Sequence, residues 1–512
     1  MTKQLPSLYT DICRHARETA LLHTAEGVLE WDERTMLPPA GGEYRAEQLA
    51  LLAGLIHRRW TDPALVDKLS EAAAQVESDD ESDLAVNIRR LKRRVDKKLK
   101  LPQQLVEELA RTTARGQQVW QKARQESDFS QFQPALERIV ALKQQEADAL
   151  GYDSDRYDAL LDDYEPEERT PRVRQVLSDL RASLVPLVAA IADSTRKPRS
   201  ELLRGRFPIA SQQAFGRLVS ERIGFDFECG RLDVTTHPFC TSLGPRDCRI
   251  TTRYYEDFLS AALFGILHEA GHGIYDQGLP AEWYGLPRGE AVSLGIHESQ
   301  SRLWENLVGR SRAFWRHFLP RAQEVFAPVL SEVSLDEFVF AINEVRPSLI
   351  RVEADEATYN LHILVRFELE HALLGGDLNV ADLPGAWNEK YREYLGIVPG
   401  NDAEGVLQDV HWSAGLIGYF PTYALGNLYA AQFFERANKD LGCQEEAFAR
   451  GEFTPLREWL RENIHSTGQR FSAAELVERV TGKPLSSAPL LSHLQRRFGP
   501  LYGLRSVADG GV

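Results

Sequence analysis

The chain has 512 residues, of which 43% are hydrophobic, and its 60 Lys and Arg residues face 75 Asp and Glu residues. The formal net charge of −15 argues against a nucleic-acid partner, because a phosphate-binding surface needs an excess of basic groups. The basic run at residues 89–100 follows an acidic run at 77–83, which is typical of a solvated helix. Without an 18-residue apolar run or a secretion signal, we expect a cytoplasmic protein that does not span a membrane.

The five cysteines are scattered, and none belongs to a CxxC pair of the kind that binds zinc or cycles between thiols and a disulfide. We therefore expect them to be reduced and without a functional role. Cys240 and Cys248 are predicted to be loop and strand residues and not ligands.

Apolar residues recur every three or four positions along most of the chain, which predicts a mainly α fold. Long antiparallel helices are expected from Leu8 to about Leu150, and a further helix over Thr170–Ala192. Residues 248–254 alternate like a strand, and helices dominate again from residue 256 onward. No linker divides the chain, so we expect one helical unit over 1–512. Residues 1–200 would form mostly flanking helices, and residues 201–512 the metal-binding and catalytic part.

The clearest functional signal is His268-Glu269-Ala270-Gly271-His272, which follows an apolar segment. An acidic pair before this segment, and Gly278 and Pro280 after the motif, predict one helix of about six turns. Histidines four residues apart share a helix face and can bind one metal ion, with Glu269 placed to act as a general base. A chance HExxH string is expected at the surface, whereas the apolar flanks here predict burial.

A catalytic zinc site has three protein ligands and one open position, so a third ligand should follow. We expect it to be Glu298, in a second helix running from about Glu290 to Gly309. The rival ligand is His297, but a neighbour on a helix points about 100° away, which favours a packing or substrate-side role for it. A His₂Glu set suits Zn²⁺ and also accepts Co²⁺ or Mn²⁺.

A further helix is expected to begin near Ser348, after Pro347. It would carry a polar stripe, as in the wall of a wet cavity, made of Arg351, Asp355, Thr358 and His362. The alternative is a structural ion pair between Arg351 and Asp355.

Two residues of a later aromatic-rich segment, His411 and Tyr423, are separated by a short turn. Both could reach a developing oxyanion. The alternative is that this turn serves only packing.

Taken together, these segments resemble the carboxypeptidase Taq family of metallocarboxypeptidases. The six short motifs of that family occur in order, as His237-Pro238-Phe239, Asp247-Cys248-Arg249-Ile250-Thr251, and residues 268–272, 297–300, 350–355 and 405–412. The resemblance extends along nearly the whole chain. It implies a large saddle-like helical fold with a long active-site groove flanked by the N-terminal helices, and a small β element near the metal site. It also implies a homodimer and the release of single residues from peptides with a free C-terminus.

The resemblance and the chemistry of the residues together suggest roles. Glu269 would take a proton from a metal-activated water, and His411 and Tyr423 are nominated as oxyanion donors by resemblance to related helical metallopeptidases. Arg351, with Arg249 as the alternative, would bind the terminal carboxylate of the substrate, since arginine offers a planar pair of donors. His237 would shape the substrate end of the groove or be purely structural.

Two other functions are open at this point. One is an oligopeptidase or endopeptidase on the same scaffold, which would also cut amidated peptides. The other is a non-catalytic helical binding protein that keeps a structural zinc. The presence of Glu269 counts against the second, because a structural site needs no base beside its ligands.

Overall fold

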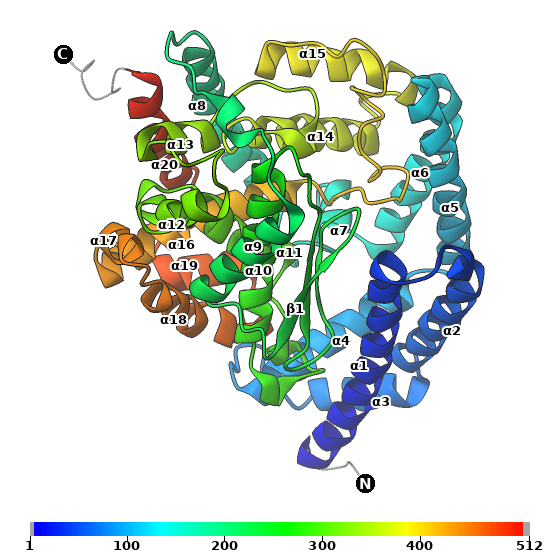
Figure 1. The fold of residues 1–512 in the computed structure, drawn as a ribbon. Coiled ribbons are helices and arrows are strands. Elements are labelled where there is room, and N and C mark those ends of the chain that lie inside the picture. The colour runs from blue at the N-terminus through cyan, green and yellow to red at the C-terminus, as the bar shows by residue number, and fades with distance from the viewer. Residues whose placement is uncertain (1–4, 505–512) are drawn as a thin grey trace, which may run out of the picture. The chain divides into compact units, whose positions relative to one another are not determined.

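The computed structural model describes residues 5–504. The chain forms two compact units, each built from three stretches of sequence. The first unit contains the residues up to 99 together with 200–342 and 433–482. The second unit contains residues 100–199, 343–432 and the residues from 483 on. The mainly α fold is confirmed, with twenty α-helices and one small sheet among the described residues (Figure 1).

The first unit begins with four helices whose apolar residues form a shared core. These helices are α1 (Leu5–Thr35), α2 (Gly42–Trp60), α3 (Pro63–Ala73) and α4 (Asp83–Lys100). The break before α3 has a local cause, because the carboxylate of Asp62 accepts the backbone N–H of Ala64 at 2.9 Å and Pro63 cannot extend a preceding helix. The core that joins the four helices includes Ile12, Ile56, Leu69 and Leu91.

The central stretch of the first unit carries the predicted metal residues. Its helices are α9 (Ile209–Ile223), α10 (Leu259–Gly278), α11 (Leu294–Arg302), α12 (Arg312–Val325) and α13 (Leu335–Ile342), and one turn of π-helix covers Leu303–Val308. The last stretch of the unit adds α17 (Glu445–Ala449), α18 (Thr454–Asn463) and α19 (Ala473–Thr481).

A three-stranded sheet lies beside α10 in the first unit (Figure 1). Its strands are β1 (Gly230–Val234), β2 (Cys240–Ser242) and β3 (Cys248–Thr252), and β3 is the central one. β1 pairs with β3 in parallel, and β2 pairs with β3 antiparallel so that Cys240 is opposite Ile250 and Ser242 is opposite Cys248. The strand predicted at 248–254 and the small β element near the metal residues are therefore confirmed.

The second unit contains helices and loops but no strand among its described residues. It contains α5 (Gln103–Glu126), α6 (Phe129–Leu150), α7 (Arg156–Leu161), α8 (Thr170–Ala192), α14 (Tyr359–Gly375), α15 (Leu383–Leu395) and α20 (Ala488–Tyr502). α16 (Pro421–Leu441) begins in this unit and ends in the first. By length and composition alone, α8 could cross a membrane, but the core helix of a folded domain passes the same test. One face of α8, which includes Leu177, Leu180 and Leu184, is buried inside the unit, where α8 contacts α14, α15 and α20.

The helix predicted to begin near Ser348 does not exist, because α14 begins only at Tyr359. Residues 346–358 form a loop with a single short turn of 3₁₀-helix at Arg351–Glu353. The physical reason is Asp355, whose carboxylate accepts the backbone N–H groups of Arg346, Ala357 and Thr358 at 2.9–3.0 Å. These bonds satisfy the backbone of the loop without a helix.

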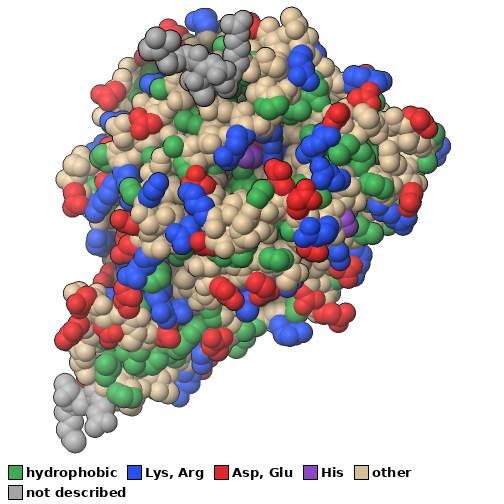
Figure 2. All heavy atoms as spheres, turned by 90° about the vertical axis from the view of Figure 1, so that its left-hand side faces the viewer, with side chains coloured by type: hydrophobic (Ala, Val, Ile, Leu, Met, Phe, Trp, Pro, Cys, Tyr) green, Lys and Arg blue, Asp and Glu red, His purple; other side chains and the backbone are tan. Residues whose placement is uncertain are grey.

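On the surface seen in Figure 2, acidic and basic side chains are interspersed among the residues drawn in colour. Many surface charges of the described residues are paired over short sequence distances, as in Lys439 with Glu435 and Arg450 with Glu452. Exposed pairs of this kind contribute little to stability, about 0–1 kcal/mol each. Their main effect is to keep large fields of one sign from forming.

Candidate active site

The HExxH motif lies in the middle of α10, whose apolar residues Leu263, Ile266 and Leu267 are buried. Gly271, within the motif, lets α11 approach closely. A Cβ atom at this position would lie 2.6 Å from both the carbonyl oxygen of Gln300 and the Cα atom of Ser301. The small residue therefore brings the backbone of α11, and with it Glu298, next to the two histidines.

Three predicted ligands converge between α10 and α11. Glu298 Oε2 lies 3.3 Å from His272 Nε2 and 3.6 Å from His268 Nε2, and the three ligand atoms are all within 4.8 Å of one another. Ser301 and Arg302 hold the carboxylate in place, since Ser301 Oγ donates to Oε2 at 3.1 Å and Arg302 Nε donates to Oε1 at 2.7 Å. Two imidazole nitrogens and one carboxylate oxygen form a donor set that fits a divalent transition metal.

The second nitrogen of each motif histidine also has a partner. His268 Nδ1 lies 2.9 Å from Glu305 Oε2, on the π-helical turn that follows α11. Burial would raise the pKa of Glu305, but Arg302 and His268 outweigh it and lower this pKa to about 2. His272 Nδ1 lies 2.5 Å from Nδ1 of His297, whose Nε2 lies 2.9 Å from Asp276 Oδ1. Partners of this kind orient metal-binding histidines.

Glu269, the predicted base, is buried with 6% of its surface exposed. Burial raises its pKa to about 7, against an opposing effect of nearby His268. A carboxylate in such surroundings is close to evenly balanced between its two protonation states at neutral pH. It can therefore both take up and return a proton.

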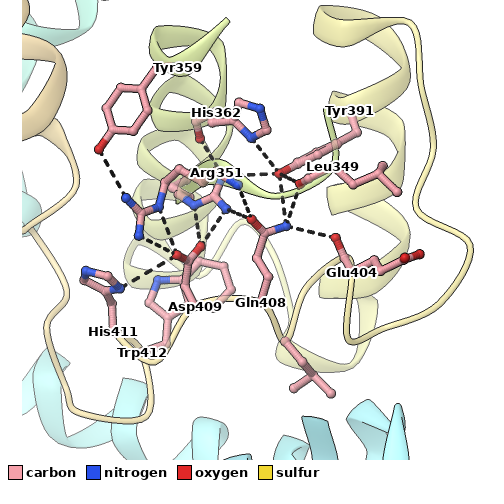
Figure 3. Close-up of polar contacts among 12 residues, drawn as sticks. Leu349, Arg351, Tyr359, His362, Tyr391, Glu404, Gln408, Asp409, His411 and Trp412 are labelled. Carbon is pink, nitrogen blue, oxygen red and sulfur yellow. Dashed lines mark hydrogen bonds and ion pairs between the residues drawn. The ribbon is translucent and has the colours of Figure 1, made fainter. Parts of the chain in front are cut away.

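The polar motif residues of the second unit form their own buried network (Figure 3). Arg351 is 5% exposed, and its Nε and Nη2 atoms lie 2.9 and 2.8 Å from Asp409 Oδ1. The other carboxylate oxygen of Asp409 accepts from Arg366 Nε at 2.6 Å. The alternative ion pair between Arg351 and Asp355 is therefore wrong, since Asp409 is the partner of Arg351.

His411 and Tyr423 meet in the second unit, with ring centroids 6.3 Å apart. Burial lowers the pKa of His411 to about 4, so that its ring is neutral at physiological pH. Burial raises the pKa of Tyr423 well above its usual value, so that its hydroxyl keeps its proton. Both side chains are thus in protonation states that can donate a hydrogen bond. The guanidinium of Arg351 lies over the ring of Tyr423, 5.2 Å from its centroid.

Comparison with known proteins identifies the family. The family model for carboxypeptidase Taq (M32) metallopeptidases matches residues 11–498 of this sequence. The chain belongs to this family. It is 49% identical to thermostable carboxypeptidase 1 of Thermus thermophilus, over 97% of this chain and 99% of that protein. It is 38% identical to carboxypeptidase 1 of Bacillus subtilis, over 98% of both chains.

A solved structure supports the same assignment. The M32 carboxypeptidase of Deinococcus radiodurans matches with a TM-score of 0.94 at 40% identity, covering 97% of this chain and all of that one. This protein is therefore a metallocarboxypeptidase, a hydrolase that acts on peptides and uses a divalent metal.

The remaining predicted residues of this M32 carboxypeptidase lie in or next to the small sheet. Arg249 on β3 makes a two-pronged ion pair with Asp247, at 2.9 and 3.0 Å, and lies over the ring of Trp31. His237 is exposed in the segment between β1 and β2. The sequence did not predict that Glu305 contacts His268, that His297 contacts His272, or that Asp276 contacts His297. The one available signal was that Asp276 is four residues after His272 on the same helix.

Proposed function

We propose that this metallocarboxypeptidase binds Zn²⁺ through His268, His272 and Glu298, with Glu269 as the general base. The observation that carries the proposal is the convergence of His268 Nε2 and His272 Nε2 on Glu298 Oε2. The buried carboxylate of Glu269 directly follows His268 in the chain. Co²⁺ and Mn²⁺ suit the same donors, and the metal assay described below includes them.

The reaction follows from these positions. When bound, the divalent ion acts as a Lewis acid that polarises a carbonyl group and lowers the pKa of water. Glu269 accepts a proton from the attacking water and passes it to the leaving amine. Glu305 and His297 keep the two imidazole rings oriented throughout, so that the geometry need not reorganise during the reaction.

The remaining assignments concern the substrate, a peptide with a free C-terminus. We propose that Arg351 binds its terminal carboxylate, with Arg249 as the alternative. The protonation states of His411 and Tyr423 support their proposed role as donors to the oxyanion. His237 is exposed, which is compatible with contact to a long peptide.

The experiment is a peptide digest followed by mass spectrometry. A peptide and its C-terminal amide are incubated with the enzyme as purified, after chelation, and after return of Zn²⁺, Co²⁺ or Mn²⁺. We expect a ladder of products that lack one, two or more C-terminal residues from the free acid, loss of this ladder on chelation, and the highest rate with Zn²⁺. Internal fragments, or equal cleavage of the amide, would instead indicate an endopeptidase.

We also propose that the enzyme is a cytoplasmic homodimer. The resemblance to the family supports this proposal. Sedimentation equilibrium measures the subunit number directly, and a mass equal to one chain of 57.8 kDa at micromolar concentration would contradict the dimer.

A further inference from the structure

Next to the predicted metal site, the fold brings together two thiols and a carboxylate that the sequence does not connect. Cys240 is on β2, Cys248 is on β3, and Asp276 is near the end of α10. Cys240 Sγ lies 3.7 Å from Cys248 Sγ and 3.9 Å from Asp276 Oδ2. The three ligand atoms are all within 4.8 Å of one another. We call this group the Cys–Asp site.

The strand register explains why the thiols meet. Cys240 is opposite Ile250 and Cys248 is opposite Ser242, so the two cysteines are diagonal neighbours on the same face of an antiparallel pair. Gly273 allows that face to pack against α10. A Cβ atom there would lie 3.3 Å from Cys248 Sγ and 2.5 Å from a ring atom of Phe225. The pairing and the glycine place both thiols over the end of the helix that carries Asp276.

The distances match those between ligands of one ion. Two thiolates bound to a tetrahedral zinc ion at ~2.3 Å are about 3.8 Å apart, and a thiolate and a carboxylate oxygen about 3.5 Å apart. The observed separations are 3.7 and 3.9 Å. All three groups are shielded from bulk water, since Cys248 is 2% exposed, the side chain of Asp276 is 10% exposed, and Cys240 is partly buried.

We propose that Cys240, Cys248 and Asp276 form a second metal site, for a thiophilic divalent ion such as Zn²⁺ or Cd²⁺. Thiolate ligands select such ions over Mg²⁺, Ca²⁺ and Mn²⁺, and three protein ligands leave one position for water. Binding releases the thiol protons, because a coordinated thiol is deprotonated. In the free protein, the hydrogen bond between the Cys240 thiol and Cys248, together with burial, raises the pKa of Cys240, so metal binding strengthens as pH rises.

Asp276 belongs to this site and also to the surroundings of the catalytic residues. Its Oδ1 atom lies 2.9 Å from His297 Nε2, while Oδ2 faces Cys240. The two oxygens of one carboxylate thus serve two neighbouring sites. The thiols distinguish the new site chemically, because the His₂Glu set contains no sulfur ligand.

The test uses CdCl₂ as the probe, since sulfur ligation produces a thiolate-to-cadmium absorption band in the ultraviolet that imidazole and carboxylate ligands lack. Full-length protein with one equivalent of zinc, in a non-thiol reductant, is titrated with CdCl₂. We expect an absorption band with the intensity of two thiolate ligands. The band should stop growing by the time two equivalents of cadmium have been added. Cys240→Ser and Cys248→Ser should each weaken cadmium binding by more than the ~10–100-fold that loss of an outer partner costs.

The matched control is Cys443→Ser, which removes an exposed cysteine and should leave the band unchanged. Asp276→Asn keeps both thiols but replaces a charged ligand oxygen by a neutral amide. It should weaken cadmium binding by more than the ~10–100-fold cost of losing an outer partner, so the proposal remains testable if a cysteine variant fails to fold. Absence of the band in the wild-type protein would overturn the proposal. So would a band that persists at full intensity in Cys240→Ser and Cys248→Ser.

Discussion

Nδ1 of His297 lies 2.5 Å from Nδ1 of His272, so one of these rings donates a hydrogen bond to the other. A neutral histidine that binds a metal through Nε2 carries its proton on Nδ1. With the proposed metal on Nε2 of His272, His272 is the donor and His297 the acceptor, and His297 in turn donates from Nε2 to Asp276. Burial and the neighbouring His297 lower the pKa of His272 to about 4, which keeps its ring neutral as metal binding requires.

This relationship predicts different outcomes for two neighbouring substitutions. His297→Ala leaves all three ligands in place but removes the acceptor that orients His272, so metal affinity should fall about 10–100-fold. Glu298→Ala removes a ligand and should lower the affinity much further. Competition against a chromophoric chelator measures both constants. Loss of metal from His297→Ala with retention in Glu298→Ala would make His297 the ligand instead.

The second prediction concerns carboxylate recognition by Arg351. Arg351→Ala should lower kcat/KM on free-acid peptides by the equivalent of about 2–5 kcal/mol, the cost of losing a desolvated, charge-assisted pair. Cleavage of the matching amide should change little, so the ratio of acid to amide rates should collapse. Steady-state kinetics on the two substrates gives this ratio directly.

The structure supplies an alternative that the same assay can detect. Arg351 is buried against Asp409, so it could serve only to hold the loop that carries His411. In that case acid and amide rates would fall together and their ratio would persist. Arg249→Ala, tested on the same substrates, is the comparison. Arg249 is the other candidate arginine, and its guanidinium makes a two-pronged contact with Asp247. An unchanged ratio in both variants would place carboxylate recognition elsewhere.

The third prediction concerns the stability of the second unit, where Glu370 on α14 is buried. Its carboxyl group accepts from Tyr157 Oη at 2.7 Å, Trp412 Nε1 at 2.9 Å and the backbone N–H of Gly418 at 3.0 Å. Glu370→Gln leaves one oxygen for three donors and should lower the free energy of unfolding by ~1–3 kcal/mol. Thermal unfolding measures the loss, and Glu137→Gln, at an exposed position, is the control.

The pH dependence of this effect has a definite sign. Burial raises the pKa of Glu370 to about 7, above its value of about 4.3 in an unfolded chain. The folded state then binds more protons in this range, so the contribution of Glu370 to stability is full below about pH 4.3 and declines as pH rises through 7. The wild-type protein should have a higher free energy of unfolding than Glu370→Gln, and this difference should shrink from pH 5 to pH 8. An advantage that grows with pH would mean that Glu370 is ionised in the folded state.

The helices and the meeting of His268, His272 and Glu298 could be predicted because their signals are local. The bounds of α8 coincide with the predicted Thr170–Ala192, and the histidine spacing fixes a shared face on α10. The second predicted helix begins four residues late, at Leu294, because Ser293 Oγ accepts the backbone N–H of Ile296 and caps it there. Boundaries depend on such single contacts.

The failures concern contacts that the pattern of residue types does not reveal. The expected helix at Ser348 rested on a polar stripe, but Asp355 binds backbone groups of its own loop and Arg351 pairs with Asp409, 58 residues later. The meeting of Cys240 with Cys248 depends on a strand register that their spacing does not reveal. The contact of His297 with His272 depends on the close approach of α10 and α11 at Gly271, which residue spacing does not reveal.

The most direct test of the central claim is Glu269→Gln, assayed for bound metal and for turnover. The amide keeps the shape of the side chain but cannot accept the proton of water, so we expect full metal content and a loss of several orders of magnitude in kcat. Glu305→Gln, which changes a nearby, partly buried carboxylate that contacts His268, is the control and should mainly weaken metal binding. A Glu269→Gln enzyme that retained its metal and more than about a tenth of the wild-type kcat would contradict the assignment of Glu269 as the base.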